Sequence, residues 1–440
     1  MERPVVAVVV VWVCVCAASA DDWPQWGGPQ RDLVWRESGL VDTLPPEALP
    51  RIWSAPISEG YAGPAVAGGR VYVTDRVHGE GSHGQERVLC LDAATGQEIW
   101  KYAYDCEYTI SYPAGPRATP VVDEDRVYSL GAVGHLMCFA VSTGEIVWQK
   151  HFPTDFGTNL PTWGLAASPL VDGDQLIVLV GGPGALVVSF DKRTGEERWR
   201  SLDDAAVGYC PPVIFDFAGS RQLIQWHPSA VSSLDPQTGV VKWQVPFAVQ
   251  AGLTIPTPRQ VGNRLFVTAF YNGPLMLSVK PDGSGADVLW KGKSESEINT
   301  DGLHAIMCTP IVDETHIYGV CSYGQLRCLD AKTGARLWET TEATGEGRWW
   351  NAFLVPHEPA GGSGPGDGHR TLILNEQGEL IIARLSPQGY EEQSRSLLIE
   401  PTRSLGRRSR MVVWSHPAFA DKSVFARNDR ELIRVSLAGE

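Results

Sequence analysis

A chain of 440 residues with a net charge of −14 is too acidic to present a nucleic-acid surface. Its composition, 43% apolar and 20% charged, is typical of a globular protein, and its 46 glycines and 31 prolines indicate many turns. The apolar runs are short and rich in Val, Ile and Tyr, without the period of about 3.6 residues that marks a helix. We therefore expect short strands joined by turns.

The first twenty residues differ from the rest. An apolar run follows Arg3 and ends at the small residues Ala18-Ser19-Ala20, which is typical of a secretory signal peptide cleaved before Asp21. The alternative is a retained membrane anchor, but the run is short for a span of about 20 residues. We predict a signal peptide over residues 1–20, no transmembrane segment after it, and a periplasmic or secreted protein.

Residues 21–50 form an irregular lead-in, with three tryptophans among Pro, Gly and Asp. We expect this lead-in to lie across the outside of the fold. The next segment, Arg51-Ile52-Trp53-Ser54, has the pattern of one isolated strand.

One phrase, Asp-x-x-Thr-Gly-x-x-x-Trp, then recurs along the chain. Complete copies end at Trp100, Trp199, Trp243 and Trp338, and altered copies end at Trp148 and Trp290. The intervals of 48, 51, 44, 47 and 48 residues indicate a repeat protein. Gly permits the left-handed turn of a hairpin, and Asp can accept its backbone N–H groups. We expect the tryptophans to dock between neighbouring repeats: Trp53, Trp100, Trp148, Trp199, Trp243, Trp290 and Trp338.

A second motif, a proline shortly before a β-rich run, marks the start of a repeat, and we call these residues the phase prolines. It occurs at Pro64, Pro120, Pro169, Pro212, Pro258, Pro310 and Pro417, and a repeat without it begins near Asn351. Each repeat supplies four strands, here called A to D, which is one propeller blade. The last repeat ends in a third strand over 432–437, so the strand around Trp53 completes it. We predict an all-β protein, a monomeric eight-bladed propeller of four-stranded antiparallel blades over 51–440.

Seven cysteines follow the signal peptide, an odd number that cannot pair completely. Cys90, Cys138 and Cys328 each precede a repeat tryptophan by ten residues, so we expect small core residues there. No cysteine or histidine spacing is typical of zinc, and we predict no metal site from the residues themselves.

These motifs resemble the repeat of pyrroloquinoline-quinone (PQQ) enzymes, the eight-bladed quinoprotein alcohol and glucose dehydrogenases. They also resemble the BamB family of outer-membrane assembly lipoproteins, which share the repeat without the cofactor. The lead-in Asp22-Trp23-Pro24-Gln25-Trp26 is similar to the start of secreted bacterial PQQ-like propellers. The resemblance covers about 21–440 and implies a propeller of the cell envelope, whereas the shared motifs belong to blade architecture rather than to an active site.

The enzymatic residues of the quinoproteins do not carry over. Those enzymes have adjacent cysteines beside the quinone and hold calcium with Glu, Asn and Asp, and neither set can be placed on this sequence. The lipid-bearing cysteine of BamB-like proteins is also missing. We assign no catalytic residue, and PQQ with calcium stays open because quinoproteins without adjacent cysteines exist.

A ligand site would lie where the loops before the A strands surround the axis. Counting from the phase prolines predicts a funnel of Tyr61, Arg117, Trp163, Tyr209, His304, Met307, Arg348, Trp350, Asn351, Trp414 and His416. Arginine can bind a carboxylate through two hydrogen bonds, and aromatic faces stack on planar ligands or sugars. The alternative is that these aromatics cap the blade interfaces. The basic run Arg403–Arg410 approaches the same face, as a solvated loop or as a patch for an anion or partner.

Three functions follow from this sequence. The first, which we favour, is a binding or scaffold protein of the cell envelope without catalysis, whose partners are other envelope proteins or a small planar or anionic ligand. The second is a PQQ-dependent dehydrogenase that uses the central funnel. The third is a carbohydrate-binding propeller.

Overall fold

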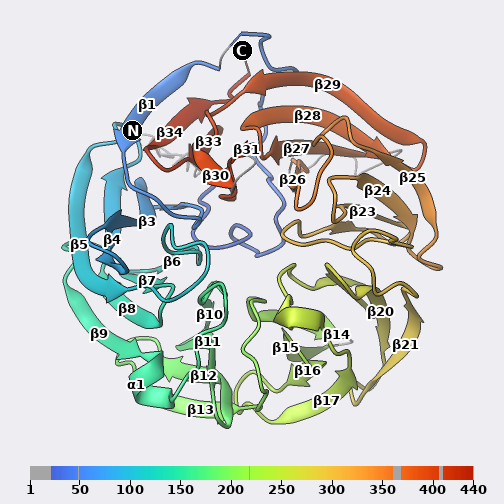
Figure 1. Ribbon diagram of the computed structural model, residues 1–440, viewed down its shortest axis with the longest axis horizontal. Coiled ribbons are helices and arrows are strands. Elements are labelled where there is room, and N and C mark those ends of the chain that lie inside the picture. Colours follow the sequence, from blue (N-terminus) through green and yellow to red (C-terminus); the bar gives the residue numbers. More distant parts are fainter. Residues whose placement is uncertain (1–20, 48, 218, 360–367, 406–409, 440) are drawn as a thin grey trace, which may run out of the picture.

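Eight four-stranded antiparallel sheets surround a central axis in the computed structural model, which describes residues 21–439 except 48, 218, 360–367 and 406–409. The predicted all-β, eight-bladed propeller is confirmed (Figure 1). The predicted signal peptide lies outside the described residues. Among those described, no helix has the length and apolar character needed to cross a bilayer.

Each blade runs from an innermost strand to an outermost strand. Blade 1 contains β2 (Ala65–Ala67), β3 (Arg70–His78), β4 (His83–Asp92) and β5 (Glu98–Glu107). Blade 2 contains β6 (Val121–Asp123), β7 (Arg126–Leu130), β8 (His135–Ala140) and β9 (Ile146–His151). Blades 3 and 4 contain β10 (Leu170–Asp172), β11 (Gln175–Gly182), β12 (Ala185–Asp191), β13 (Glu197–Ser201), and β14 (Val213–Phe217), β15 (Ser220–His227), β16 (Ala230–Leu234), β17 (Val241–Pro246).

The second half of the ring repeats this order. Blades 5 and 6 contain β18 (Arg259–Val261), β19 (Arg264–Ala269), β20 (Gly273–Val279), β21 (Ala286–Lys291), and β22 (Ile311–Val312), β23 (His316–Val320), β24 (Leu326–Asp330), β25 (Arg336–Thr340). Blades 7 and 8 contain β26 (Ala352–Pro356), β27 (His369–Asn375), β28 (Glu379–Ser386), β29 (Gly389–Leu397), and β32 (Ala418–Ala420), β33 (Ser423–Arg427), β34 (Glu431–Ser436), β1 (Arg51–Pro56). Outside the blades lie helix α1 (Phe152–Phe156), a short turn of 3-10 helix at Gln250–Gly252, and a hairpin of β30 (Arg403–Leu405) and β31 (Arg410–Val412).

The two ends of the chain close the ring. Strand β1 pairs antiparallel with β34, with Trp53 opposite Arg434, as the sequence predicts. This pairing leaves no blade without its fourth strand, and a closed ring protects sheet edges better than an open one.

The repeated phrase forms a turn against which the preceding blade packs. Asp92 accepts hydrogen bonds from the backbone N–H groups of Ala94 and Thr95 at 3.1 and 2.8 Å, and Gly96 has a φ of 72°. The indole of Trp53, from blade 8, lies against Gly96. The turn is therefore the docking surface for the neighbouring blade's tryptophan.

In blade 4 a glutamine mediates this docking. The indole N–H of Trp243 donates to Oε1 of Gln222 at 2.8 Å, and Nε2 of Gln222 donates to the carbonyl of Gly283 in the next turn at 3.1 Å. Ser233 donates to the same Oε1 at 2.6 Å. Blade 3 has the same arrangement in Trp199, Gln175, Ser189 and Pro236. Buried cysteines replace these serines in blades 1, 2 and 6, at Cys90, Cys138 and Cys328.

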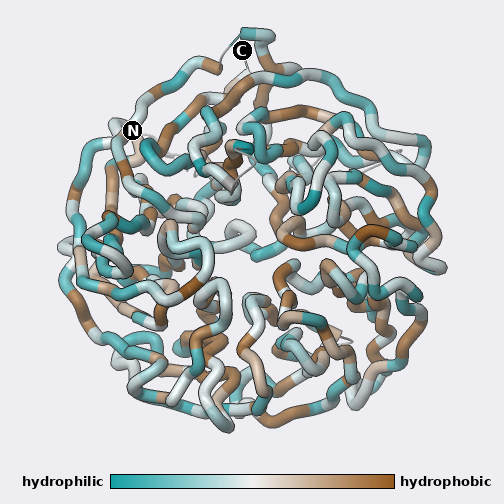
Figure 2. Tube along the Cα trace, viewed as in Figure 1, coloured by the Kyte–Doolittle hydropathy of each residue, from teal (hydrophilic) through white to brown (hydrophobic). Residues whose placement is uncertain are grey.

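Apolar side chains fill the interior of the blades. Figure 2 shows apolar stretches along the strands, interrupted by hydrophilic turns. The buried core includes Val71, Ile177, Leu275 and Leu354, each at most 2% exposed. Replacing one such side chain by alanine typically lowers the free energy of unfolding by about 2 to 5 kcal/mol.

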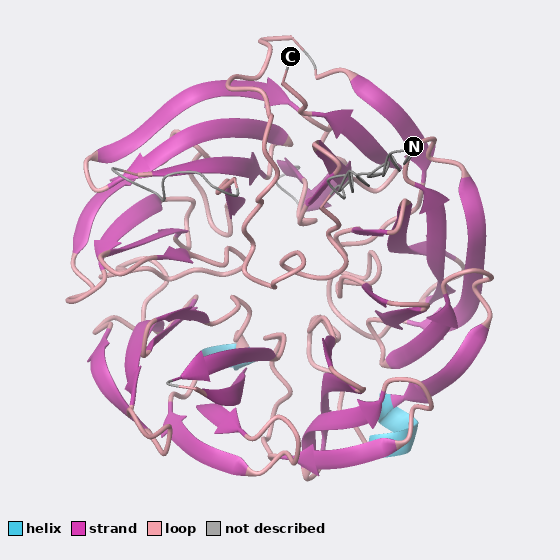
Figure 3. Cartoon of the chain, turned by 180° about the vertical axis from the view of Figure 1, so that it is seen from behind, coloured by secondary structure: helices cyan, strands magenta, loops and turns pink. Residues whose placement is uncertain are grey.

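The lead-in does not lie across the outside, contrary to our expectation. Trp23 pairs with Val66 of β2, with N–H donating to carbonyl at 2.8 Å, and the N–H of Trp35 donates to Pro356 of β26 at 2.9 Å. Between them, Arg31 donates to the carbonyls of Pro169 and Pro212 at 2.9 and 3.1 Å. The segment thus crosses the centre of the ring along the innermost strands, as the view from behind shows (Figure 3). Trp23 and Trp35 are buried there, whereas Trp26 is partly exposed.

Candidate functional site

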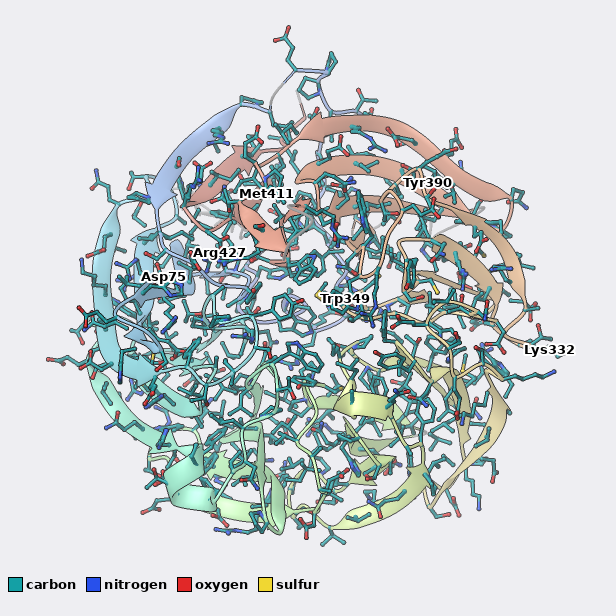
Figure 4. All side chains as sticks on the ribbon, in the orientation of Figure 1. Asp75, Lys332, Trp349, Tyr390, Met411 and Arg427 are labelled. Atoms are coloured by element: carbon teal, nitrogen blue, oxygen red, sulfur yellow. The ribbon has the colours of Figure 1, made fainter. Side chains whose placement is uncertain are left out.

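A cavity of about 240 Å³ lies on the propeller axis, where loops from all eight blades converge. Figure 4 shows Trp349, one of the residues that line the cavity, near the centre of the ring. The rings that line the cavity are Trp26, Tyr61, Tyr112, Trp163, Tyr209, Tyr271, Trp349, Phe353, Trp414 and His416. Leu253, Ile255, Ile306 and Met307 add aliphatic surface. Such a wall excludes water and offers flat apolar faces to a ligand.

The structure brings most of the predicted funnel residues together at this cavity: Tyr61, Arg117, Trp163, Tyr209, Met307, Trp414 and His416. The other four lie elsewhere. His304 is fully buried between the carbonyl of Phe270 and Asp301, and Asn351 is 2% exposed in the core. Arg348 pairs with Glu297 at 2.8 Å, and Trp350 packs under the guanidinium of Arg410 at 4.9 Å.

Trp26 contributes from the lead-in, which we did not predict. Its indole N–H donates to Oγ1 of Thr257 in blade 5 at 3.0 Å, and its ring meets His416 of the loop before blade 8 edge-on at 4.9 Å. The lead-in therefore supplies part of the cavity wall. A tryptophan outside the repeats carries no signal for this role, because its position depends on the path of an irregular segment.

Two aromatic residues with left-handed backbone face each other at the cavity. Tyr112 has a φ of 54° and Trp349 a φ of 66°, and their ring centroids are 6.4 Å apart. Bulky residues adopt such φ values rarely and at a cost of about 1 to 3 kcal/mol, which often marks a binding site. Tyr112 also packs against Trp414 at 6.1 Å. The three rings belong to loops preceding blades 2, 7 and 8.

Four of the described arginines lie near this end of the axis and differ in their partners, while Arg407 and Arg408 of the predicted basic run lie outside the described residues. Arg348 pairs with Glu297 at 2.8 Å, Arg403 with Glu59 and Asp429 at 2.8 and 2.7 Å, and Arg410 with Glu376 at 2.7 Å. The guanidinium of Arg117, by contrast, donates to the carbonyls of Gly115, Ser111 and Tyr112. Within the described chain, no carboxylate lies within ion-pair distance of Arg117. The buried carboxyl of Glu86, which accepts hydrogen bonds from Tyr104 and Tyr108, interacts with this charge without forming an ion pair.

Arg117 also stacks on the cavity wall. Its guanidinium lies 5.1 Å from the ring centroid of Tyr61, and Arg403 lies 5.7 Å from the same ring. Burial lowers the pKa of Arg117, but a guanidinium keeps its proton in a protein. The described cavity wall therefore contains one permanent positive charge among mostly apolar and aromatic side chains.

His416 is a further polar group in the wall. Its Nδ1 lies 2.6 Å from the carbonyl oxygen of Pro417, so Nδ1 must carry the proton. Burial lowers the pKa of His416 to about 4, so the ring is neutral at pH 7 and Nε2 is an acceptor. Nε2 is buried, and none of the described groups bonds to it. A buried acceptor without a donor is costly unless a ligand or water completes it.

Glu376 stands behind the wall formed by Trp414. It is 1% exposed, accepts the indole N–H of Trp414 at 3.1 Å and approaches Arg410 of β31. Burial outweighs these partners and raises the pKa of Glu376 to about 7. The carboxyl therefore changes charge near neutral pH while it holds a cavity residue in place.

A serine–histidine–aspartate arrangement occurs in blade 4. His227 lies 2.5 Å from Asp204 and 2.8 Å from Oγ of Ser232. Ser232 is fully buried, and Gln244 also donates to its oxygen at 2.9 Å. A nucleophile must be accessible to its substrate, so we regard this set as a structural network.

The cavity does not fit a calcium-bound quinone. Calcium takes six to eight oxygen ligands, chiefly carboxylates and carbonyls. Among the described residues the cavity wall has no Asp, Glu or Asn, and no group of three His, Cys, Asp or Glu side chains is placed to hold a metal ion. The donor set instead favours an organic ligand without a metal.

Fold and repeats define a PQQ-like propeller, here with an aromatic cavity on its axis. A family model described as outer membrane protein assembly factor BamB matches residues 32–113 and 84–340, and the chain belongs to this family. The resemblance predicted from the repeats is thereby confirmed.

Relatives and solved structures agree with this assignment. The BamB protein of Burkholderia pseudomallei (strain K96243) is 24% identical over 68% of this chain and 71% of its own length, and that of Yersinia pestis is 22% identical over 64% and 66%. BamB from Moraxella catarrhalis superposes with a TM-score of 0.57 at 14% identity, over 88% of this chain and 97% of that structure. Quinohemoprotein alcohol dehydrogenase from Comamonas testosteroni also gives 0.57, at 13% identity over 95% and 81%. At such identities these structures show a shared fold.

Proposed function

We propose that this chain is a non-catalytic binding protein of the cell envelope and that the axial cavity is its ligand site. The cavity carries the proposal: aromatic rings from seven of the eight blades and from the lead-in line it, and it contains one arginine without a carboxylate at ion-pair distance in the described chain. Relatives named as outer membrane assembly factors support a place in the envelope, with other envelope proteins as partners.

Ligand binding is tested by isothermal titration of the mature protein with flat aromatic probes: the anions 1-anilinonaphthalene-8-sulfonate and 2-naphthoate, and the uncharged 2-naphthol. We expect saturable binding that Trp349→Ala weakens about tenfold or more, because a stacked ring contributes about 0.5 to 1.5 kcal/mol beyond the area it buries. Trp338→Ala, at a blade interface away from the cavity, is the matched control. Equal binding by wild type and Trp349→Ala would place the site elsewhere.

Catalysis is tested separately by mixing the protein with PQQ and calcium and following dye-linked oxidation of alcohols and aldoses. We expect no turnover, because the described residues of the cavity wall include no carboxylate or side-chain amide to hold calcium. Turnover above the protein-free rate would replace the binding proposal by a dehydrogenase. A glycan array in parallel tests the carbohydrate alternative, for which cavity-dependent binding of a sugar would be required.

A further inference from the structure

Polar groups in the cavity wall restrict the choice of ligand further than the shape of the cavity does. This inference rests on the proposed function. The wall contains two polar groups that remain incomplete within the described chain, and the two have opposite requirements. Arg117 is a cation without a carboxylate at ion-pair distance, and Nε2 of His416 is an acceptor that lacks a donor. The rest of the lining is mostly apolar or aromatic, with Ser168 and the tyrosine hydroxyls as further polar groups.

The comparison with the neighbouring arginines makes Arg117 informative. Arg403 also lies over the ring of Tyr61 and is neutralised by Glu59 and Asp429. Arg117 stacks on Tyr61 as well, yet its three acceptors are backbone carbonyls. Carbonyls satisfy hydrogen bonds without cancelling a charge. The carbonyls accept both hydrogens of Nη2 and one hydrogen of Nη1, so Nε and Nη1 each keep one N–H that can donate to a carboxylate, whose charge the guanidinium also attracts.

His416 adds a second, independent requirement. The carbonyl of Pro417 fixes the proton on Nδ1, so Nε2 can only accept. The ring is 6% exposed and is held between Trp26 and Phe353, at centroid distances of 4.9 and 5.0 Å. A ligand hydroxyl or N–H would complete this nitrogen, whereas a purely apolar ligand would leave it unpaired at a cost.

The body of the ligand follows from the rings. Tyr112, Trp349 and Trp414 form one aromatic wall, and Trp163 and Tyr209 form another. Flat faces of this kind favour a planar, ring-bearing body. We propose that the cavity binds a planar hydroxylated aromatic acid, with its carboxylate on Arg117 and its hydroxyl donating to Nε2 of His416.

The test compares three matched probes on the intact mature protein by isothermal titration at pH 7. They are 6-hydroxy-2-naphthoate, 2-naphthoate and the methyl ester of the hydroxy acid. We expect the hydroxy acid to bind roughly 10- to 100-fold more tightly than its ester, as loss of a charged hydrogen-bonded pair predicts. We expect it to bind about 3- to 10-fold more tightly than 2-naphthoate, which lacks the donor.

Two single substitutions test which residue causes each of these two preferences. Arg117→Gln should abolish the preference for acid over ester, and His416→Phe should abolish the preference for the hydroxylated acid. Arg403→Gln is the matched control, since it faces the same tyrosine but is already neutralised, and it should keep both preferences. Thermal melts confirm folding of each variant. If Arg117→Gln fails to fold, the probe comparison on the wild-type protein still decides.

The outcomes separate this inference from the proposed function. Equal affinity for acid and ester overturns the assignment of an anionic ligand and leaves a ligand-binding cavity in place. If Arg403→Gln loses the preference for acid over ester and Arg117→Gln keeps it, the role of Arg117 is overturned. If none of the three probes nor the flat probes above binds at millimolar concentration, the proposed function itself fails.

Discussion

The indole N–H of Trp53, near the start of the ring, donates to the carbonyl oxygen of Ala93 at 2.9 Å, across the junction between blades 8 and 1. A Cβ built on Gly96 in the same turn would lie 2.7 Å from the ring of Trp53. The docking of a terminal strand on the first blade therefore depends on a glycine for two reasons, its φ of 72° and the closeness of the indole.

Gly96→Ala should destabilise the protein more than Gly68→Ala. Both glycines have positive φ, 72° and 57°, but a Cβ at Gly68 would meet nothing within 4 Å. In both variants, left-handed backbone strain lowers the free energy of unfolding by about 1 kcal/mol. In Gly96→Ala, overpacking against the indole lowers it by roughly a further 1 to 3 kcal/mol. Urea denaturation followed by intrinsic fluorescence measures the difference. Equal midpoints for the two variants would show that the indole moves away without cost.

The glutamine in blade 4 gives a second test. Gln222→Ala removes the acceptor for Trp243 and Ser233 and leaves a cavity, so we expect a loss of about 2 to 4 kcal/mol. Gln222→Met keeps most of the volume and isolates the hydrogen bonds. Gln97→Ala, in an exposed turn, is the control. A Gln222→Met variant as stable as wild type would mean that only packing matters at this position.

The sequence predicts the blades well because their signals are local. Asp92, Gly96 and Trp100 belong to one turn and one strand, and the same spacing recurs in every well-formed repeat. The strand around Trp53 could be assigned to blade 8 because blade 8 otherwise lacks a fourth strand. The path of the lead-in carries no periodic signal, so the placement of Trp26 could not be predicted.

The cavity was predictable only in part. Residues just before an A strand, such as Tyr61 and Trp414, follow from counting back from a phase proline. Blade 7 lacks that proline, so the counting selected Asn351, and the predicted funnel included the neighbouring Trp350 but not Trp349. The left-handed backbone of Trp349, with a φ of 66°, turns the chain so that this residue lines the cavity. Tyr112 lies further from its blade, in a loop without any motif.

Glu376 predicts a pH dependence of stability. Its pKa is about 7 in the folded protein, raised by burial from an ordinary value of 4.5, so the folded state holds the proton more tightly. The stabilisation from this group is fully present below pH 4.5 and is lost as the pH rises to 7, by up to about 3 kcal/mol at about 1.4 kcal/mol per unit.

Glu376→Gln isolates this contribution, because glutamine resembles the protonated acid and does not titrate. The free energy of unfolding of the variant, minus that of the wild type, should increase between pH 4.5 and 7 and then level off. Denaturant melts at half-unit intervals of pH measure this difference. A difference that stays constant over the range would show that the carboxyl keeps one charge state throughout.

Arg31 ties the lead-in to two blades, and its replacement tests whether this segment stabilises the ring. Arg31 is 9% exposed and donates to the carbonyls of Pro169 and Pro212, in blades 3 and 4. Arg31→Ala leaves both carbonyls without this donor, so we expect a loss of about 2 to 4 kcal/mol. Arg221 also joins blades 4 and 3, through Asp172, but its side chain is 53% exposed. Arg221→Ala should therefore cost at most about 1 kcal/mol.

The same pair of variants tests whether the lead-in forms part of the cavity wall. Arg31 lies five residues after Trp26, so loosening the segment at Arg31 should also release the indole from Thr257. We expect Arg31→Ala to weaken the binding of 2-naphthoate, and Arg221→Ala to leave it unchanged. Binding that is unaffected in a folded Arg31→Ala protein would mean that the ring alone forms the cavity, since a wall that depends on the lead-in cannot survive its displacement.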